Sequence, residues 1–299
     1  MRTLLQIAWR NVWRNKRRSL IVISSIAFGI FAMILSMGIM NGFNVQMVEN
    51  AIGLSLGHIS IHHKHWIDEM KLQLHYTPSE KIISKINKNF NIVGYAPRIK
   101  IEGMISSSAT SRQVLVFGID PTLEQNASAL CRYIVKEKPS RFFSTSDKDS
   151  VIISKEMAKK LDLMIGDKTV LMIQDKNRQI QGIGLTVVGL YETPIDEFDK
   201  FSVFVPIRKM QEITGLAENV SQIIVRLKNS RHADKIKQTL SHALDDASLE
   251  ILTWKEMDPS MVRAIKLFDQ MMYFFFAIIF ITVVFSVANT LIMAVVERF

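Results

Sequence analysis

Histidine is the residue type whose spacing most suggests chemistry in this chain. Five of the seven histidines fall in one short stretch, at His58, His62, His63, His65 and His75. Imidazole nitrogens are good ligands for zinc, copper or nickel. In an extended strand, His58 and His62 share a face while His63 points away, and Asp68 and Glu69 add the only nearby carboxylates. We favour a solvated strand rim over a metal site and expect no bound metal.

Acidic residues form a second candidate cluster later in the chain. Carboxylate oxygens bind hard cations, but a charged connecting segment is usually a solvated loop, and we expect a loop here. The cluster consists of Glu192, Asp196, Glu197 and Asp199. The sequence has no G-x-x-x-x-G-K-[ST] phosphate loop and no H-E-x-x-H motif. We therefore expect no catalytic residues, no cofactor and no ATP hydrolysis by this chain.

Two long uncharged segments determine how the rest of the chain is placed. Residues 19–48 and 270–296 contain no charged side chain. About 20 mainly apolar residues suffice to cross the hydrocarbon core of a bilayer as a helix. We predict a first membrane helix at residues 19–48 and a stalk with a second membrane helix at residues 258–296. Between them, residues 49–257 form a large polar block.

The charge before the first span predicts the topology. Six cations precede it, and no acidic residue occurs before Glu49; the cations are Arg2, Arg10, Arg14, Lys16, Arg17 and Arg18. Cations beside a span stay in the cytoplasm and meet anionic lipid heads. The chain's net charge of +9 therefore does not indicate nucleic acid, and we expect the polar block to be extracytoplasmic.

Residues 1–18 have the pattern of an amphipathic helix lying in the cytoplasmic membrane interface. Its expected anchors are Trp9, Trp13, Arg14, Arg17 and Arg18. The apolar segment that follows is longer than the core of a signal peptide and lacks a small-residue cleavage site, so we expect an uncleaved anchor. Cys131 is the only cysteine, which excludes an internal disulfide.

The polar block mixes strand and helix patterns and is expected to be α+β. Alternating or β-rich segments predict strands at residues 57–62, 91–95, 99–105, 112–119, 168–174, 179–191, 201–205, 221–227 and 249–253. Helical periodicity predicts helices at residues 80–90, 155–161, 206–214 and 233–244, while residues 122–149 read as irregular. Asp258-Pro259 is a helix start, and no Gly or Pro follows. One rigid helix is therefore expected to run through the second span.

Several short motifs, in order, resemble FtsX-like and MacB-like ABC transporter permeases, with the lipoprotein-releasing (Lol-type) branch nearest. They are Ile7-Ala8-Trp9-Arg10-Asn11-Val12-Trp13-Arg14-Asn15-Lys16-Arg17-Arg18, Val187-Val188-Gly189-Leu190-Tyr191-Glu192-Thr193, Glu197-Phe198-Asp199, Val203-Phe204-Val205-Pro206, Ala288-Asn289-Thr290-Leu291-Ile292-Met293 and Val296-Glu297-Arg298-Phe299. The resemblance covers essentially the whole chain. It implies a bacterial inner-membrane, multi-pass protein whose periplasmic domain is of the MacB-like core type, with a porter-like core and an inserted lobe at about residues 120–200.

The same resemblance implies a permease that works by mechanotransmission. Its expected partners are an ABC ATPase subunit, a second permease copy (identical or not), membrane lipid, and a lipoprotein or periplasmic carrier protein. Its expected activity is lipoprotein release from the inner membrane or export of a hydrophobic or periplasmic substrate. Glu297 and Arg298 would begin the ATPase-coupling region. Such permeases continue into a coupling helix and two more spans, so the chain is expected to be a fragment or a truncated form.

Two alternatives share this layout. One is an FtsX-like regulator of a cell-wall hydrolase, and the other is a two-span periplasmic sensor.

For the transporter, we expect a lipid-facing or substrate-facing cleft lined by Met33, Met37, Met40, Phe274, Phe275 and Ile278, although simple helix packing explains the same pattern. Asn289 is polar within a span and is expected to face a protein partner.

Overall fold

The computed structural model describes residues 16–69, 71–242 and 246–296. The chain divides into two compact units. Residues 1–47 and 259–299 make up one, called here the helix unit, and residues 48–258 make up the other, called here the domain.

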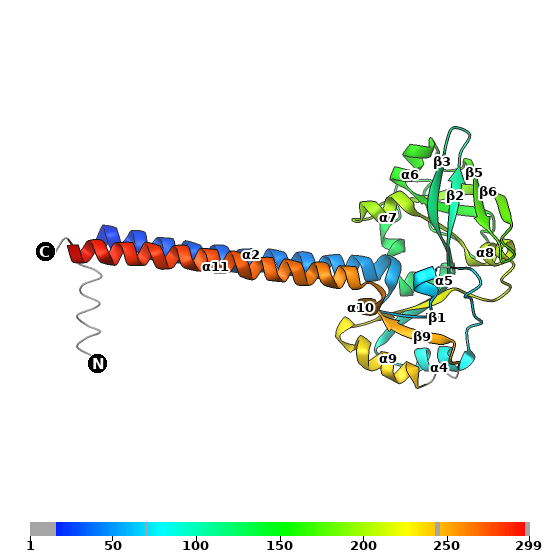
Figure 1. The fold of residues 1–299 in the computed structure, drawn as a ribbon. Coiled ribbons are helices and arrows are strands. Elements are labelled where there is room, and N and C mark those ends of the chain that lie inside the picture. The colour runs from blue at the N-terminus through cyan, green and yellow to red at the C-terminus, as the bar shows by residue number, and fades with distance from the viewer. Residues whose placement is uncertain (1–15, 70, 243–245, 297–299) are drawn as a thin grey trace. The chain divides into compact units, whose positions relative to one another are not determined.

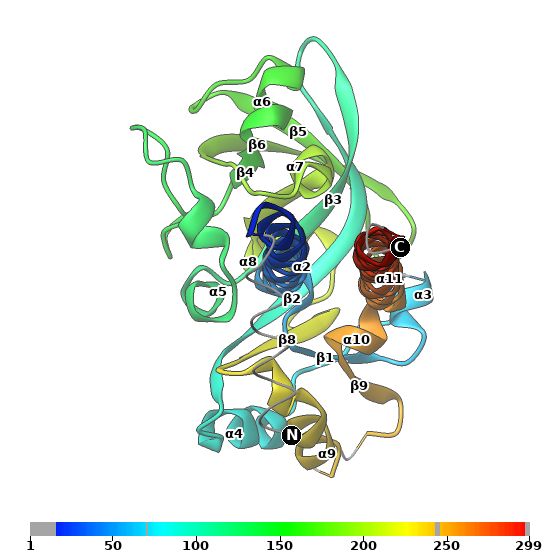
Figure 2. The ribbon, with the colours of Figure 1, turned by 90° about the vertical axis from the view of Figure 1, so that its left-hand side faces the viewer.

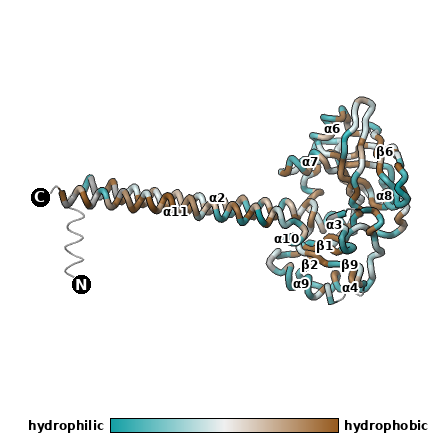
Figure 3. The backbone as a smooth tube through the Cα atoms, viewed as in Figure 1, coloured by the Kyte–Doolittle hydropathy of each residue, from teal (hydrophilic) through white to brown (hydrophobic). Residues whose placement is uncertain are grey.

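The helix unit consists of two long apolar helices that lie side by side (Figure 1). Helix α2 spans Lys16–Ala51 and helix α11 spans Pro259–Val296. Both are mostly hydrophobic along their length (Figure 3), and both are long and apolar enough to cross a membrane. Gly29 lets them approach closely, because a Cβ there would lie 3.3 Å from Cγ2 of Val283. The predicted start of the second helix at Pro259 is confirmed.

The two helices run antiparallel, and besides the contact at Gly29 they touch near the end of α2 and the start of α11. The rings of Phe43 and Phe268 meet edge to face with centroids 6.4 Å apart. One residue further, the buried Asn44 amide nitrogen lies 3.5 Å from a carboxylate oxygen of Asp269. These contacts fix the register in which the two helices pack.

The domain is built on a mixed sheet that contains nine strands among the described residues. The strands are β1 Ile59–His63, β2 Ile92–Ser106, β3 Ser111–Ile119, β4 Ser150–Ser154, β5 Lys168–Gln174, β6 Ile180–Tyr191, β7 Ser202–Pro206, β8 Gln222–Leu227 and β9 Leu249–Thr253. Their order is β3-β7-β4-β6-β5-β2-β8-β1-β9, and β3 also pairs with β2. That last pairing closes six strands into a barrel and leaves β8, β1 and β9 as a sheet that extends from β2.

Strand β2 belongs to both parts of the sheet. Its first half pairs with β8, and from Arg98 onward it pairs with β3. Pro97 lies where the two pairings meet and faces only β8, so its missing N–H costs no bond to a second neighbour. Our prediction of two separate strands here is wrong for that reason, since Pro97 is tolerated inside one continuous strand.

Helices and short helical turns cover the sheet (Figure 2). They are η1 Ile52–Leu56, α3 Trp66–Glu69, α4 Glu80–Lys88, α5 Pro121–Ala127, η2 Leu130–Tyr133, α6 Lys155–Leu161, α7 Asp196–Phe201, α8 Ile207–Thr214, η3 Ser230–His232, α9 Ala233–Ser241 and α10 Trp254–Met257. Helix α5 packs on β2 and β8, α8 packs on β2, β3 and β7, and α9 packs on β9. The α+β character predicted for this part of the chain is confirmed.

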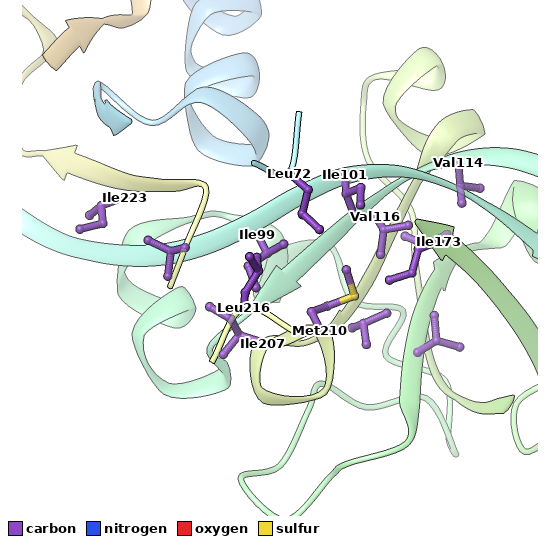
Figure 4. Close-up of a cluster of buried hydrophobic side chains, with 14 of the residues drawn as sticks. Leu72, Ile99, Ile101, Val114, Val116, Ile173, Ile207, Met210, Leu216 and Ile223 are labelled. Atoms are coloured by element: carbon purple, nitrogen blue, oxygen red, sulfur yellow. The ribbon is translucent and has the colours of Figure 1, made fainter. Parts of the chain in front are cut away.

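One apolar core joins the barrel to the extended sheet. Figure 4 shows Ile99, Ile101 and Ile223 pointing into it together with Met210 from α8. A second cluster is aromatic, with Phe117 and Phe204 stacked at 5.4 Å between ring centroids and Tyr191 edge-on to Phe204. The alternation of inward apolar and outward polar residues along the strands produces both clusters.

Several local predictions hold and others fail. The helix at Lys155–Leu161 and the hairpin of β5 and β6 are confirmed. The segment read as irregular contains helix α5 and the turn η2. The expected acidic loop contains helix α7, and the Asp199 carboxylate is buried, accepting hydrogen bonds from the Thr193 amide and hydroxyl. A charged side chain can be buried when local donors satisfy it, which a charge count does not reveal.

Candidate functional site: the junction at the end of the first apolar helix

The first apolar helix ends inside the domain in a single π-helical turn. Helix α2 passes directly into η1, and the Gly57 amide closes the turn by donating to the Ile52 carbonyl at 2.9 Å. Gly57 has φ +67°, and a Cβ there would lie 3.0 Å from Cβ of Ile224. Only glycine fits this left-handed and crowded position without strain. The chain can therefore turn straight from the helix into strand β1.

A buried arginine holds the carbonyl end of this turn. Arg98 Nη1 donates to the Leu54 carbonyl at 3.2 Å and to the Ser55 carbonyl at 3.0 Å. The last carbonyls of a helix lack partners within the helix and carry partial negative charge. The Arg98 guanidinium supplies both the hydrogen bonds and the compensating charge. We call Leu54, Ser55, Arg98 and Glu124 the junction.

The other side of the Arg98 guanidinium is paired with Glu124. Arg98 Nε donates to Glu124 Oε2 at 3.2 Å, and Nη2 donates to Glu124 Oε1 in a second, short contact. Both side chains are fully buried, at 0% exposure. A two-pronged guanidinium–carboxylate pair of this kind is strong and fixes orientation. It joins strand β2, which carries Arg98, to helix α5, which carries Glu124.

Local sequence signals place Glu124 at this position. Asp120 caps helix α5 by accepting from the amides of Thr122 and Leu123, and Pro121 occupies the first helical position. The cap fixes where the helix begins and therefore which residue faces the sheet. Glu124 then points inward toward Arg98 of strand β2.

The chain leaves the domain beside the place where it enters. Strands β1 and β9 pair antiparallel, with Ile59 opposite Thr253. The His58 carbonyl, directly before β1, accepts from the Trp254 amide at 3.1 Å. A capping box between Thr253 and Glu256 then begins α10, which ends just before α11. Both apolar helices are thus joined to neighbouring strands of one sheet by very short, hydrogen-bonded connections.

The charges around the junction are desolvated. The Arg98 guanidinium lies 5.8 Å from the centre of the Phe117 ring, and the Lys100 ammonium lies 5.7 Å from the same ring. Burial, with a smaller contribution from Arg98, lowers the pKa of Lys100 to about 8. This arrangement suits a rigid mechanical connection: its polar groups are used to hold elements together.

The junction does not have the form of a hydrolase site, although Gly53-Leu54-Ser55-Leu56-Gly57 matches the pattern G-x-S-x-G. In a nucleophile elbow that pattern follows a strand and opens a helix. Here it lies at the end of a helix and before a strand, which is the reverse order. The match therefore carries no catalytic meaning.

The histidine cluster is not a solvated rim, contrary to our expectation. His58 and His62 are both buried, while His65 is exposed. Burial, and to a smaller extent Arg226, lowers the pKa of His58 to about 4. Burial also lowers the pKa of His62. Among the described residues, no group of three His, Cys, Asp or Glu side chains is placed to hold a metal ion.

The residues expected to line a cleft lie on the helix unit. The helix register brings Met33 to the level of Ile278 and Met37 to the level of Phe274. Met37 is 53% exposed and Phe274 is 66% exposed, with Phe275 and Ile278 also exposed, while Met33 and Met40 are half-buried. The exposed members of this set face outward from the helix pair, so a cleft formed with another chain or with lipid stays a prediction.

The expected anchors and coupling residues fall largely outside the described residues. Trp9, Trp13 and Arg14 precede them, and Glu297 and Arg298 follow them. Arg17 is exposed in the first turns of α2, and Arg18 belongs to the same helix. Asn289 is exposed on α11.

Sequence reasoning missed Arg98 and Glu124. Arg98 interrupts an otherwise apolar stretch, Ala96-Pro97-Arg98-Ile99, which is a weak sign of a buried charge. Glu124 lies three residues after the Pro of a capped helix start, which the reading of this segment as irregular overlooked. Nothing in the linear pattern shows that these two residues meet.

Comparison with known proteins agrees with this architecture. A family model described as the MacB-like periplasmic core domain matches residues 19–243. The lipoprotein-releasing system transmembrane protein LolC of Neisseria meningitidis is 22% identical over 94% of this chain and 66% of its own length. The corresponding LolE of Haemophilus influenzae is 21% identical over 100% of this chain and 72% of its own length. The chain thus spans about two thirds of the length of these relatives.

A solved structure of the periplasmic region of MacB from Actinobacillus actinomycetemcomitans is also similar, with 14% identity, a TM-score of 0.48, and coverage of 72% of this chain and 97% of that one. The two apolar helices flank the domain, which is the arrangement of an inner-membrane protein whose large domain lies in the periplasm. Because the family model covers more than half of the chain, the chain belongs to the MacB-like periplasmic core domain family.

Proposed function

We propose that this chain is a permease subunit of an ABC transporter that works by mechanotransmission and releases lipoproteins from the inner membrane. Family membership supports the permease role, and the relatives named as lipoprotein-releasing system proteins support the substrate class. In this proposal a partner subunit hydrolyses ATP, and this chain converts the resulting movement into rearrangement of the periplasmic domain.

The junction is the observation that carries the proposal. Transmission of movement requires that a membrane helix be joined to the domain without a flexible linker. Here helix α2 runs into η1, whose terminal carbonyls are held by Arg98, and Arg98 is itself fixed by Glu124. A displacement of the helix end would therefore act directly on strand β2 and helix α5.

Strand β2 extends the effect through the domain. It is shared by the barrel and the extended sheet, so a displacement at Arg98 reaches both parts. The second apolar helix is joined to β9 through α10, next to the same entry point. In the proposed cycle, the two helices of one chain and those of a second permease copy close and open together, and substrate leaves from the outer face of the membrane.

Depletion of the full-length protein in its own bacterium tests this function. We expect lipoproteins destined for the outer membrane to accumulate in the inner membrane, as measured by membrane fractionation, and wild-type protein supplied in trans to restore sorting. Arg98→Met protein should accumulate in the membrane but fail to restore sorting, whereas Lys136→Gln, at an exposed position away from the junction, should restore it. Normal sorting after full depletion would remove lipoprotein release from the proposal.

A further inference from the structure

A basic cavity lies in the domain beside the last turn of helix α2. It has a volume of about 350 Å³. Arg132 from η2, Arg226 from β8 and Lys228 just after β8 line it, together with His58, Asn126 and Glu49. The junction described above uses none of these residues.

The cavity holds more positive charge than its own walls neutralise. Three cations and one carboxylate, Glu49, give a net charge of 3 − 1 = +2 when His58 is neutral. Among the described residues, none of the three cations has a carboxylate oxygen within the 4.0 Å of an ion pair. Burial and the neighbouring Arg132 lower the pKa of Arg226, while Glu49 acts in the opposite direction. Three like charges are thus gathered here against a single opposing carboxylate, Glu49.

His58 is a neutral side chain in the lining of the same cavity. Its Nδ1 accepts a hydrogen bond from the Leu227 amide at 3.2 Å. Since the pKa of His58 lies at about 4, the ring is neutral near pH 7 and must carry its one proton on Nε2. The lining therefore combines two guanidinium groups and an ammonium group with a neutral imidazole ring.

We propose that this cavity binds a phosphate group. A guanidinium group can donate two parallel, charge-assisted hydrogen bonds to the oxygens of one phosphate, and an adjacent ammonium group adds a further positive charge. Arg132, Arg226 and Lys228 come from two separate segments of the chain and converge on one space, which suits the several oxygens of a phosphate better than a single carboxylate.

The position of the cavity indicates two sources for that phosphate. Glu49 immediately follows the uncharged segment that ends at residue 48, and it lies within the candidate span Ser19–Leu56. Lipid head groups gather at the end of a membrane helix, so the phosphate of a phospholipid head group is one source, and free phosphate in the periplasm is the other. The inference is independent of ATPase coupling and does not require that lipoproteins be the cargo.

Binding of inorganic phosphate to the full-length protein in detergent tests the chemistry. Calorimetric titration of the wild-type protein with phosphate should show saturable binding. Titration with chloride at the same ionic strength should not. Arg132→Gln with Arg226→Gln should weaken binding about tenfold or more, because two charge-assisted contacts are lost. Glu49→Gln should tighten binding, since it removes the one repelling carboxylate. Lys136→Gln makes the same charge change as Arg132→Gln at an exposed position outside the cavity lining and should have no effect.

The two sources are separated by native mass spectrometry of protein extracted from vesicles of phosphatidylcholine with or without phosphatidylglycerol. Phosphatidylglycerol retained by wild type but lost from the double arginine variant identifies a lipid head group. Phosphate binding without retained lipid identifies free phosphate. Because Arg226 is half-buried, near-ultraviolet circular dichroism must show that the double variant is folded, and Glu49→Gln provides a test that removes no cation. Phosphate binding that is absent, or unchanged in both variants, would overturn the proposal.

Discussion

Replacement of Arg98 by methionine tests the junction most sharply. The substitution keeps much of the side-chain volume but removes every donor. It leaves the Glu124 carboxylate buried without a partner and frees the Leu54 and Ser55 carbonyls. Leaving one charge of a buried pair alone costs about 3–5 kcal/mol, and each unsatisfied buried carbonyl costs about 1–3 kcal/mol. Since such costs are not additive, we expect a loss of stability of at least about 3 kcal/mol.

A double-mutant cycle separates the charge effect from the loss of packing. Glu124→Leu alone leaves Arg98 with its two carbonyl acceptors but without its counter-charge. Arg98→Met combined with Glu124→Leu removes both buried charges, so the double variant should be more stable than Arg98→Met alone. The remaining loss in the double variant then measures the two carbonyls of the helix end.

Unfolding by denaturant of the full-length protein in detergent provides the assay, with near-ultraviolet circular dichroism as the readout. Trp254 in α10 and Trp66 in α3 report on the domain. A loss below about 1 kcal/mol for Arg98→Met, the size expected of an exposed ion pair, would refute the account of a buried, stabilising junction. So would a double variant no more stable than the single one.

Three other substitutions have defined outcomes. Lys100→Met should raise the thermal midpoint at pH 7, since the pKa of Lys100 is lowered to about 8 by burial and then by Arg98. Between pH 8 and the ordinary lysine pKa of 10.5, residue 100 holds its proton in the unfolded chain but has lost it in the folded chain. Wild-type stability should therefore rise with pH across that window, and the variant should lack the rise. Gly29→Leu should reduce the yield of a disulfide engineered between the two apolar helices in a Cys131→Ser background, whereas Gly38→Leu, where a Cβ meets nothing within 4 Å, should not. Gly57→Ala should destabilise the domain by about 1–2 kcal/mol. Gly184→Ala should cost less, because Gly184 has open space around it and no positive φ. Equal thermal midpoints for the two alanine variants would count against the left-handed turn.

The elements that sequence reasoning found are those set by local pattern. The two apolar helices follow from uncharged length, and the hairpin of β5 and β6 follows from two β-rich segments joined by a short polar turn. Helix α6 follows from its periodicity and from Ser154, which caps it through the Met157 amide. In each case the residues that decide the structure lie within a few positions of one another.

The elements that sequence reasoning missed depend on pairing between distant parts of the chain. Whether Pro97 breaks a strand depends on which neighbours β2 has at that point, and those neighbours are β8 and β3 from distant parts of the chain. The burial of His58 and His62 likewise depends on distant segments, since β1 lies between strands β8 and β9 and His58 accepts a hydrogen bond from the Leu227 amide. The pairing of Arg98 with Glu124 requires helix α5 to fold back over β2. No spacing in the sequence encodes these encounters.

The proposed permease role rests on association with an ATPase, which can be measured directly. Full-length protein carrying an affinity tag would be crosslinked in the membranes of its own bacterium, purified and analysed by mass spectrometry, and ATP hydrolysis by the purified assembly would be followed in lipid nanodiscs. The account predicts that an ABC ATPase subunit is enriched and that Arg98→Met changes the dependence of its hydrolysis on substrate without releasing the subunit. Enrichment of a cell-wall hydrolase or a signalling kinase in place of an ABC ATPase, with no ATP hydrolysis by the assembly, would contradict it.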